Sequence, residues 1–354
     1  MSNDVGAEYG YGLPRPAPAQ AAARRLVRAA SVLPVGVIGP ALPRVRRGLA
    51  GLTVFVFHDI TDNPSKFSKS IGTHTSVSVF RRQLGWILQN FDVVHAATVD
   101  QLREEIRPAI LTFDDGYVGF RDEVVPILEE LSLPAVVFVN SDVLNGEPSA
   151  AAISHWYGIT EGGDRWRDSI PATHRTRVTS LQESERWTDF WSHHGRFLSN
   201  NDLAALSDHS LICVGNHLAN HWNTAGLTTI QFREEFTRGQ NALGQFPNTL
   251  SWYAPPHGTG SQIQENLAID LGAERVLRGT GRLNPNPNSP ILDRIDMTAD
   301  ITNKLRFWWR INLQTVVRGI RSGEQKSSRR QVPPNTTNTI SEPPIPCRDS
   351  GGPL

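Results

Sequence analysis

Two adjacent carboxylates, Asp114 and Asp115, stand at the end of the apolar run AILTF and directly before Gly116. Successive residues of a strand point to opposite faces, but a turn at a glycine lets both side chains reach the same end of the strand. Two like charges that lie so close raise the pKa of one carboxyl group unless a cation lies between them. The pair therefore predicts a metal site at this strand end.

Further ligands for such a metal occur in GNHLANHWN, residues 215–223, which directly follows the apolar run SLICVG. His217 and His221 are four residues apart, so one helical turn would present both imidazoles on one face. Two histidines, one aspartate and water form a ligand set that suits a hydrolytic metal centre. A histidine pair alone also occurs by chance or as a buried structural pair, so its combination with DDG at another strand end carries the prediction.

The elements that must position these residues alternate along the chain. Short apolar runs predict strands, and patterns with helical spacing predict the helices between them. The predicted strands are residues 52–57, 91–96, 109–113, 134–139, 210–215, 249–254, 274–279 and 290–297, and two predicted helices are residues 78–90 and 123–131. This alternation favours parallel strands covered by helices, in an open sheet or in a β/α barrel.

A long insertion, at about residues 140–210, interrupts this alternation. It is rich in tryptophan and histidine: Trp156, Trp166, Trp187, Trp191, His155, His174, His193 and His194. We interpret it as a helical subdomain whose aromatic side chains fill a small core of its own. The alternative is a lid over the strand ends that offers tryptophan faces to sugar rings, because loops of this length are usually functional.

The ends of the chain differ from the body in composition and charge. Residues 1–49 are basic and rich in Gly, Pro and Ala, and residues 322–354 are polar and proline-rich, so both are predicted to be disordered. The predicted folded body is residues 50–300, with thirty acidic residues against nineteen basic ones in residues 51–300. An acidic body lacks the clustered Lys and Arg of a phosphate footprint, which argues against nucleic acid as a partner.

Residues 301–321 predict a basic amphipathic helix. Its apolar stripe would consist of Leu305, Trp308, Trp309, Leu313, Val316, Val317 and Ile320. Such a stripe usually packs on its own domain, but the five basic residues and paired tryptophans of residues 303–321 also suit peripheral contact with an anionic membrane. The chain has two cysteines and thus no disulfide framework, and Cys213 is predicted to be a small core residue. We expect a cytoplasmic location, with membrane association as the alternative.

Three short motifs of the sequence together resemble one protein family. TFDDG (112–116), HLANH (217–221) and YAPPHG (253–258) resemble, in this order, motifs of the polysaccharide deacetylases, also called carbohydrate esterase family 4 or the NodB-homology group. The resemblance covers about residues 50–300. It implies an α/β fold, a deformed (β/α) barrel of the NodB-homology type, with the site at the carboxyl ends of the strands. It also implies hydrolysis of the N-acetyl group of an amino sugar or polysaccharide.

The resemblance implies roles for individual residues. Asp115, His217 and His221 would hold a divalent metal, with Zn²⁺ expected. Asp114 would be the general base that takes a proton from the metal-bound water, and a backbone N–H near His257 would help to hold the oxyanion.

Two family motifs are altered in this chain. Ala254 stands at the arginine position of the motif R-x-P-x-G, and LDRIDM (292–297) replaces the motif L-x-H that supplies the general acid. We predict that Arg294 replaces the arginine that orients Asp114; the alternative is an ion pair of Arg294 with Asp293 or Asp296. We predict His257 as the proton donor, with His58 at the end of the first strand as the alternative.

The sequence therefore predicts a metal-dependent hydrolase that removes an N-acetyl or similar acyl group from a carbohydrate. One rival hypothesis is a glycan-binding pseudoenzyme that kept the metal site and lost the catalytic acid. Another is an amidase that acts on a formyl group or a small C–N substrate. The repulsion of Asp114 beside the metal ligands would have little structural use, which favours the enzyme.

Overall fold

The computed structural model describes residues 51–101, 107–162, 169–258 and 260–311 of the 354 residues. The segments predicted to be disordered, 1–49 and 322–354, lie outside these residues. None of the described helices has the length and apolar character needed to cross a membrane.

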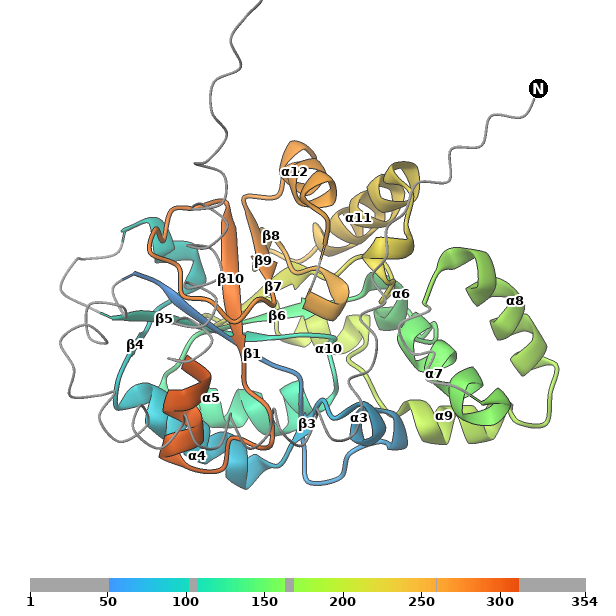
Figure 1. The fold of residues 1–354 in the computed structure, drawn as a ribbon, viewed down its shortest axis with the longest axis horizontal. Coiled ribbons are helices and arrows are strands. Elements are labelled where there is room, and N and C mark those ends of the chain that lie inside the picture. Colours follow the sequence, from blue (N-terminus) through green and yellow to red (C-terminus); the bar gives the residue numbers. More distant parts are fainter. Residues whose placement is uncertain (1–50, 102–106, 163–168, 259, 312–354) are drawn as a thin grey trace, which may run out of the picture. The chain divides into compact units, whose positions relative to one another are not determined.

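Seven parallel strands form a closed ring (Figure 1). In ring order they are β1 (Thr53–Phe57), β5 (Pro108–Phe113), β6 (Ala135–Val139), β7 (Ile212–Asn216), β8 (Thr249–Tyr253), β9 (Arg275–Arg278) and β10 (Ile291–Asp296). Strand β1 closes the ring because it pairs with both β5 and β10. The barrel predicted from the resemblance is confirmed, and the open sheet is excluded.

Apolar side chains from all seven strands meet inside the ring. This cluster contains Val54, Ile110, Val136, Phe138, Cys213, Trp252, Leu277 and Leu292, together with Ala96 and Val99 from a 3-10 helix, Ala96–Gln101. Side chains from every strand can contact one another only in the barrel interior, because neighbouring residues of each strand point outward. The interior is therefore a packed core, and Cys213 lies in it as predicted.

Helices cover the outside of the barrel on two flanks. Helices α4 (Val77–Leu88) and α5 (Val125–Leu131) pack on the outward side chains of β1, β5 and β6, while α11 (Thr229–Leu243) and α12 (Gln262–Asp270) lie on the other flank, over β8 and β9 (Figure 1). Helix α5 is preceded by a π-helix, Phe120–Val124. Both helices predicted from apolar spacing are present.

The strand predicted at residues 91–96 is much shorter in the structure. Strand β4 contains only Asp92 and Val93, and it pairs with β5. The chain then turns into the 3-10 helix, and the His95 Nδ1 atom accepts a hydrogen bond from the Ala97 N–H at 3.2 Å. This local bond stabilises the turn, and composition alone does not reveal it.

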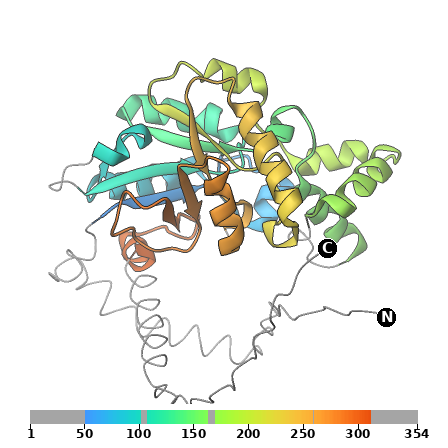
Figure 2. The same cartoon turned by 90° about the horizontal axis from the view of Figure 1, so that it is seen from above.

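The insertion is helical and has its own core, as predicted. It contains α6 (Ser141–Leu144), α7 (Ala150–Glu161), α8 (Pro171–Gln182), α9 (Trp187–His194) and α10 (Asn200–Ala205), and α7 to α9 lie to one side of the barrel (Figure 2). Trp156 is buried in this core, and Trp187 and Trp191 are packed against it. Phe67 from α3 (Lys66–Ile71) completes the cluster. Trp166 lies outside the described residues.

The C-terminal helix begins as predicted, but a different face of it is buried. Residues 304–311 are helical, and Phe307 and Ile311 are fully buried in the core beside α4. The Phe307 ring stacks on Phe55 at a centroid distance of 6.4 Å. The predicted stripe was therefore wrong in phase for this part, because Phe307 and Ile311, four residues apart, share the packed face, whereas Trp308 is only partly buried. Residues 312–321 lie outside the described part.

Candidate active site

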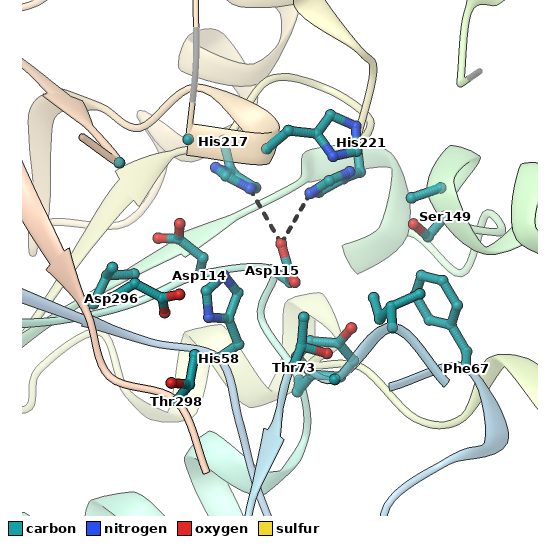
Figure 3. A pocket seen from close by; sticks show the side chains of 18 of the residues that line it. His58, Phe67, Thr73, Asp114, Asp115, Ser149, His217, His221, Asp296 and Thr298 are labelled. Carbon is teal, nitrogen blue, oxygen red and sulfur yellow. Dashed lines mark hydrogen bonds and ion pairs between the residues drawn. The ribbon is translucent and has the colours of Figure 1, made fainter. Parts of the chain in front are cut away.

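All six predicted site residues line one cavity of about 300 Å³ at the carboxyl ends of the barrel strands (Figure 3). The residues are Asp114, Asp115, His217, His221, His257 and Arg294. They come from four strand ends that are far apart in the sequence, and the closed barrel brings these ends together. This end of a β/α barrel is where active sites are found.

The two adjacent carboxylates are separated by a sharp turn at the end of β5. Asp114 continues the ladder, since its N–H donates to the carbonyl of Phe57 at 2.9 Å. Asp115 and Gly116 then adopt left-handed φ values of 74° and 72°. A Cβ atom at Gly116 would lie 2.9 Å from Cγ1 of Val139, so both the φ value and the space favour glycine. The turn allows both carboxylates to face the cavity.

The two histidines lie in an irregular loop, and the helical turn predicted for them is wrong. Leu218 has a φ of 66°, which no right-handed helix allows. The Asn216 side chain stabilises the turn, because its Oδ1 accepts from the Leu218 N–H at 2.9 Å and its Nδ2 donates to the Phe236 carbonyl at 3.0 Å. The imidazoles of His217 and His221 nevertheless lie close, with ring centroids 5.1 Å apart.

Asp115, His217 and His221 form a compact set of metal-ligating atoms. The Asp115 Oδ1 atom lies 3.2 Å from Nε2 of His217 and 3.1 Å from Nε2 of His221 (Figure 3). All three residues are buried. Ligand atoms of a tetrahedral zinc site lie about 3.3 Å apart, so this spacing suits a small divalent cation.

The hydrogen bonding of His217 supports the same conclusion. Its Nδ1 lies 2.8 Å from the carbonyl oxygen of Ala254. A carbonyl can only accept, so Nδ1 carries a proton, which leaves Nε2 as the ring atom that can bind a cation. This Nε2 atom faces the carboxylate oxygen of Asp115. A cation could bind between the two atoms, and the carbonyl would fix the ring as outer partners of metal-bound histidines do.

Arg294 contacts Asp114, as predicted for the residue that replaces the missing arginine. Its two terminal nitrogens donate to Oδ1 and Oδ2 of Asp114 at 2.6 and 2.7 Å, and both side chains are buried. The alternative partner Asp293 instead accepts from Nε of Arg278 at 2.9 Å. Such a bidentate pair fixes both the position and the plane of the carboxylate.

Both adjacent carboxylates are stabilised in their ionised form. Burial by itself raises the pKa of Asp114, but Arg294 and His217 outweigh it and the pKa lies below its ordinary value. Burial likewise opposes ionisation of Asp115, but His221 and His217 hold its pKa well below the usual range. Each of the two negative charges therefore has partners of its own, and these partners offset the repulsion expected between adjacent carboxylates.

The two candidate proton donors also line the cavity. His257 has a left-handed φ of 60°, and its ring packs edge to face on His221 at a centroid distance of 4.7 Å. His58 follows β1 and lies close to Asp114 and Asp115, whose pKa values its charge lowers (Figure 3). The structure brings both imidazoles to the site.

The sequence did not predict two groups of residues that line the cavity, although one alternative placed the insertion over the strand ends. The insertion and the segments next to it form an aromatic and apolar wall with Phe67, Ile71, Ala151 and Phe197. Asp296, at the end of β10, lines the opposite side. Phe67 carries no local signal for a pocket, whereas Asp296 could have been found because it stands two residues after Arg294 and shares its face of the strand.

Comparison with known proteins gives one family. Residues 102–276 match the family model described as polysaccharide deacetylase. No curated protein sequence matches the chain.

Three solved structures illustrate the shared fold. IcaB from Ammonifex degensii is 17% identical with a TM-score of 0.52, over 74% of this chain and 97% of that chain. The deacetylase PplD of Streptococcus pyogenes, in complex with acetate, is 13% identical with a TM-score of 0.50, over 71% and 94%. A de-N-acetylase from Aggregatibacter actinomycetemcomitans is 14% identical with a TM-score of 0.50, over 72% and 99%. At these identities the likeness shows a common fold.

Proposed function

From its membership of the polysaccharide deacetylase family, shown by residues 102–276, we propose that the protein is a metal-dependent deacetylase of an N-acetylated carbohydrate. The family makes it a hydrolase of carbon–nitrogen bonds other than peptide bonds. One observation carries the finer proposal: a carboxylate oriented by arginine, Asp114, adjoins a set of metal-ligating atoms in the same cavity. This is the combination that amide hydrolysis by an activated water needs.

Asp115, His217 and His221 would hold the cation. Zn²⁺ suits two imidazoles and one carboxylate, and when bound it would polarise the acyl carbonyl and lower the pKa of a water molecule. The carbonyl of Ala254 keeps the Nε2 lone pair of His217 directed at the site. Ala254 occupies the position of the missing arginine, so its backbone serves the ligand set while Arg294 serves the base.

Asp114 is the proposed general base. Arg294 holds both carboxylate oxygens, so the group cannot rotate away from the cavity, and each oxygen keeps a second lone pair for a proton. The lowered pKa keeps the carboxylate ionised and ready to accept. Its position next to Asp115 in the chain places it within reach of water beside the ligand set.

Departure of the amine requires a proton, and His257 is the proposed donor. Its ring packs on His221, at the rim of the ligand set. The rival donor His58 lines the same cavity next to Asp114. Because two imidazoles are present, replacement of the motif L-x-H does not leave this cavity without a group that can protonate the amine.

The test is release of acetate from oligomers of N-acetylglucosamine by the full chain. We expect turnover with zinc, its loss with a chelator, and its return when zinc is added back. Binding of the oligomers without release of acetate under any of several divalent metals would support the glycan-binding alternative. Release of formate from N-formyl substrates, with no release of acetate, would instead support the amidase alternative.

A further inference from the structure

Asp296 lies in the cavity, but the mechanism above leaves it without a task. It is the last residue of β10, and Val56 of β1 is its partner in the strand register. Figure 3 shows its side chain on the same side of the cavity as His58 and Thr298. Because Arg294 stands two residues earlier in the same strand, both side chains point toward the cavity.

The carboxylate of Asp296 lacks the partners that the other two carboxylates of the cavity have. Asp114 has Arg294, and Asp115 has two histidines. The Oδ1 atom of Asp296 is buried and has no hydrogen-bond partner, and no ion pair of Asp296 occurs within the described part of the chain. A buried acceptor without a donor is costly, so such groups usually have a partner in the functional state.

The described part of the chain shows no arginine or lysine bonded to Asp296. Arg294 is the only arginine or lysine among the described residues that line the cavity, and both of its terminal nitrogens are bonded to Asp114. The Thr298 hydroxyl donates to Asp300, and no hydrogen bond joins His58 to Asp296 in the described part, so a molecule that enters the cavity can supply the donor. Hydroxyl and ammonium groups are donors of this kind, whereas a carboxylate or phosphate would be repelled.

We propose that Asp296 is a substrate-binding residue that accepts a hydrogen bond from a hydroxyl or amino group of the glycan. It thereby makes the site prefer neutral and cationic glycans to anionic ones. This inference rests on the proposed function and names the charge class of its substrate. Each deacetylation converts a neutral amide into an amine that is protonated at neutral pH. A chain already carrying free amines would therefore bind more tightly than the fully acetylated one.

The test compares three N-acetylglucosamine tetramers: fully acetylated, with one free amine, and with a lactyl carboxylate on one sugar. For the wild type with zinc, we expect kcat/KM to be about tenfold higher for the amine-bearing than for the carboxylate-bearing tetramer, as for one charge-assisted hydrogen bond. In Asp296→Asn this ratio should fall to about one. The change should appear in the KM values, while kcat stays nearly the same. Asp300→Asn is the matched control, because Asp300 is exposed, lies outside the cavity lining and loses the same charge.

Three outcomes would overturn the proposal. An equal loss of kcat on all tetramers, with a shifted pH profile, would make Asp296 a positioning residue for an imidazole. If Asp300→Asn lowered the ratio equally, the preference for the amine-bearing tetramer would come from the overall electrostatic field of the protein and not from Asp296. A wild type without charge preference would remove the premise. Calorimetric binding of the same tetramers keeps the test independent of turnover, so a protein that binds with this preference but releases no acetate would contradict only the proposed function.

Discussion

Asp114 and Asp115 are neighbours in the chain but have different partners in the cavity. Both oxygens of Asp114 accept from Arg294, whereas Oδ1 of Asp115 faces the Nε2 atoms of His217 and His221. The left-handed φ of 74° at Asp115 makes this separation possible. Similar side chains at adjacent positions can therefore be assigned different roles.

Conservative substitutions separate these two roles. Asp114→Asn should keep zinc and lower turnover by about a hundredfold or more, since the amide cannot accept the proton. Asp115→Asn should lower the affinity for zinc, because it removes the charged ligand. Elemental analysis and acetate release measure the two effects. Equal loss of zinc in both variants would show that Asp114 is a ligand as well.

The proton donor can be identified from the leaving group. If His257 protonates the amine, His257→Gln should slow amide substrates by about a hundredfold and leave activated esters nearly unchanged, because a good leaving group needs no proton. The falling limb of the pH profile for amides should also disappear. His58→Gln is the parallel variant. A wild-type ratio of amide to ester rates in His257→Gln, with a changed ratio in His58→Gln, would transfer the role to His58.

The residues of the site were more predictable than their geometry. The residue types and their order along the chain were enough to predict which residues meet in the cavity, and the position of Arg294 near the end of a strand was enough to predict its contact with Asp114. The four-residue spacing of His217 and His221 wrongly predicted a helical turn. A left-handed Leu218 depends on hydrogen bonds from Asn216, and such bonds cannot be deduced from spacing.

At the scale of elements, the loop after β7 is the part that positions the histidines. Asn216 connects it to α11, because its side chain bonds both Leu218 and Phe236. Gly239 of α11 packs so closely that a Cβ atom there would lie 2.5 Å from Oδ1 of Asn216. The loop is thus held by the helix next to it.

Asn216→Ala should make the positions of His217 and His221 less well fixed, although both histidines remain in the chain. We expect zinc affinity to fall about 10- to 100-fold, as for other outer partners of metal ligands, with little change in helix content. A competition titration with a zinc chelator dye measures this. Asn248→Ala is the control, because the Asn248 side chain likewise forms two hydrogen bonds with the backbone. It donates to the carbonyls of Leu206 and Ile212, near the opposite end of β7. Equal losses in both variants would mean that the strand, and not the loop, controls affinity.

The insertion contains a buried histidine that joins two of its helices. His194 accepts a hydrogen bond at Nε2 from the N–H of Ser149, which precedes α7, so its Nδ1 carries the proton and donates to the Gly195 carbonyl. Burial lowers the pKa of His194 from 6.5 to about 4. The neutral ring is therefore the folded form.

This lowered pKa predicts a loss of stability in acid. In the unfolded chain His194 takes up a proton near pH 6.5, while in the folded chain it resists until about pH 4. The contribution of neutral His194 to the free energy of unfolding is complete above pH 6.5. As the pH falls toward 4, the protein loses on the order of 3 kcal/mol of this free energy. Thermal melts should show a steeper decline for the wild type than for His194→Gln over this range. Parallel declines would mean that His194 does not titrate with unfolding.

At the scale of the whole molecule, the ion pair of Arg294 and Asp114 joins the last strand of the ring to the end of β5, the second ring strand along the chain. The two residues are 180 positions apart, and both side chains are buried. Arg294→Met should cost about 3–5 kcal/mol of unfolding free energy, because it leaves a buried charge without a partner. In the background of Asp114→Asn the same change should cost much less. Urea unfolding of the metal-free variants measures this cycle, and equal costs in both backgrounds would show that the pair is uncoupled.

For the fold, as for the site, the sequence predicted the components better than their arrangement. Alternating apolar runs predicted parallel strands, but only the family resemblance distinguished a barrel from an open sheet. Closure depends on β1 pairing with both β5 and β10, and no local pattern encodes such pairing. The phase of the C-terminal helix was missed for a related reason. Phe307 is buried because Phe55 and Trp86 lie beside it, and that surface exists only in the folded barrel.

The closure of the ring also has a consequence for biosynthesis. Among the described strands of the ring, β1 comes first along the chain and β10 comes last, yet the two pair directly. A nascent chain that ends before Ile291 therefore has an open sheet with unpaired edges, and it lacks Arg294. Closure can follow only after β10 has left the ribosome, and exposed strand edges favour association with other chains during this delay. We expect the protein to complete its folding after synthesis and to depend on chaperones more than a domain of similar size whose first and last strands are not partners.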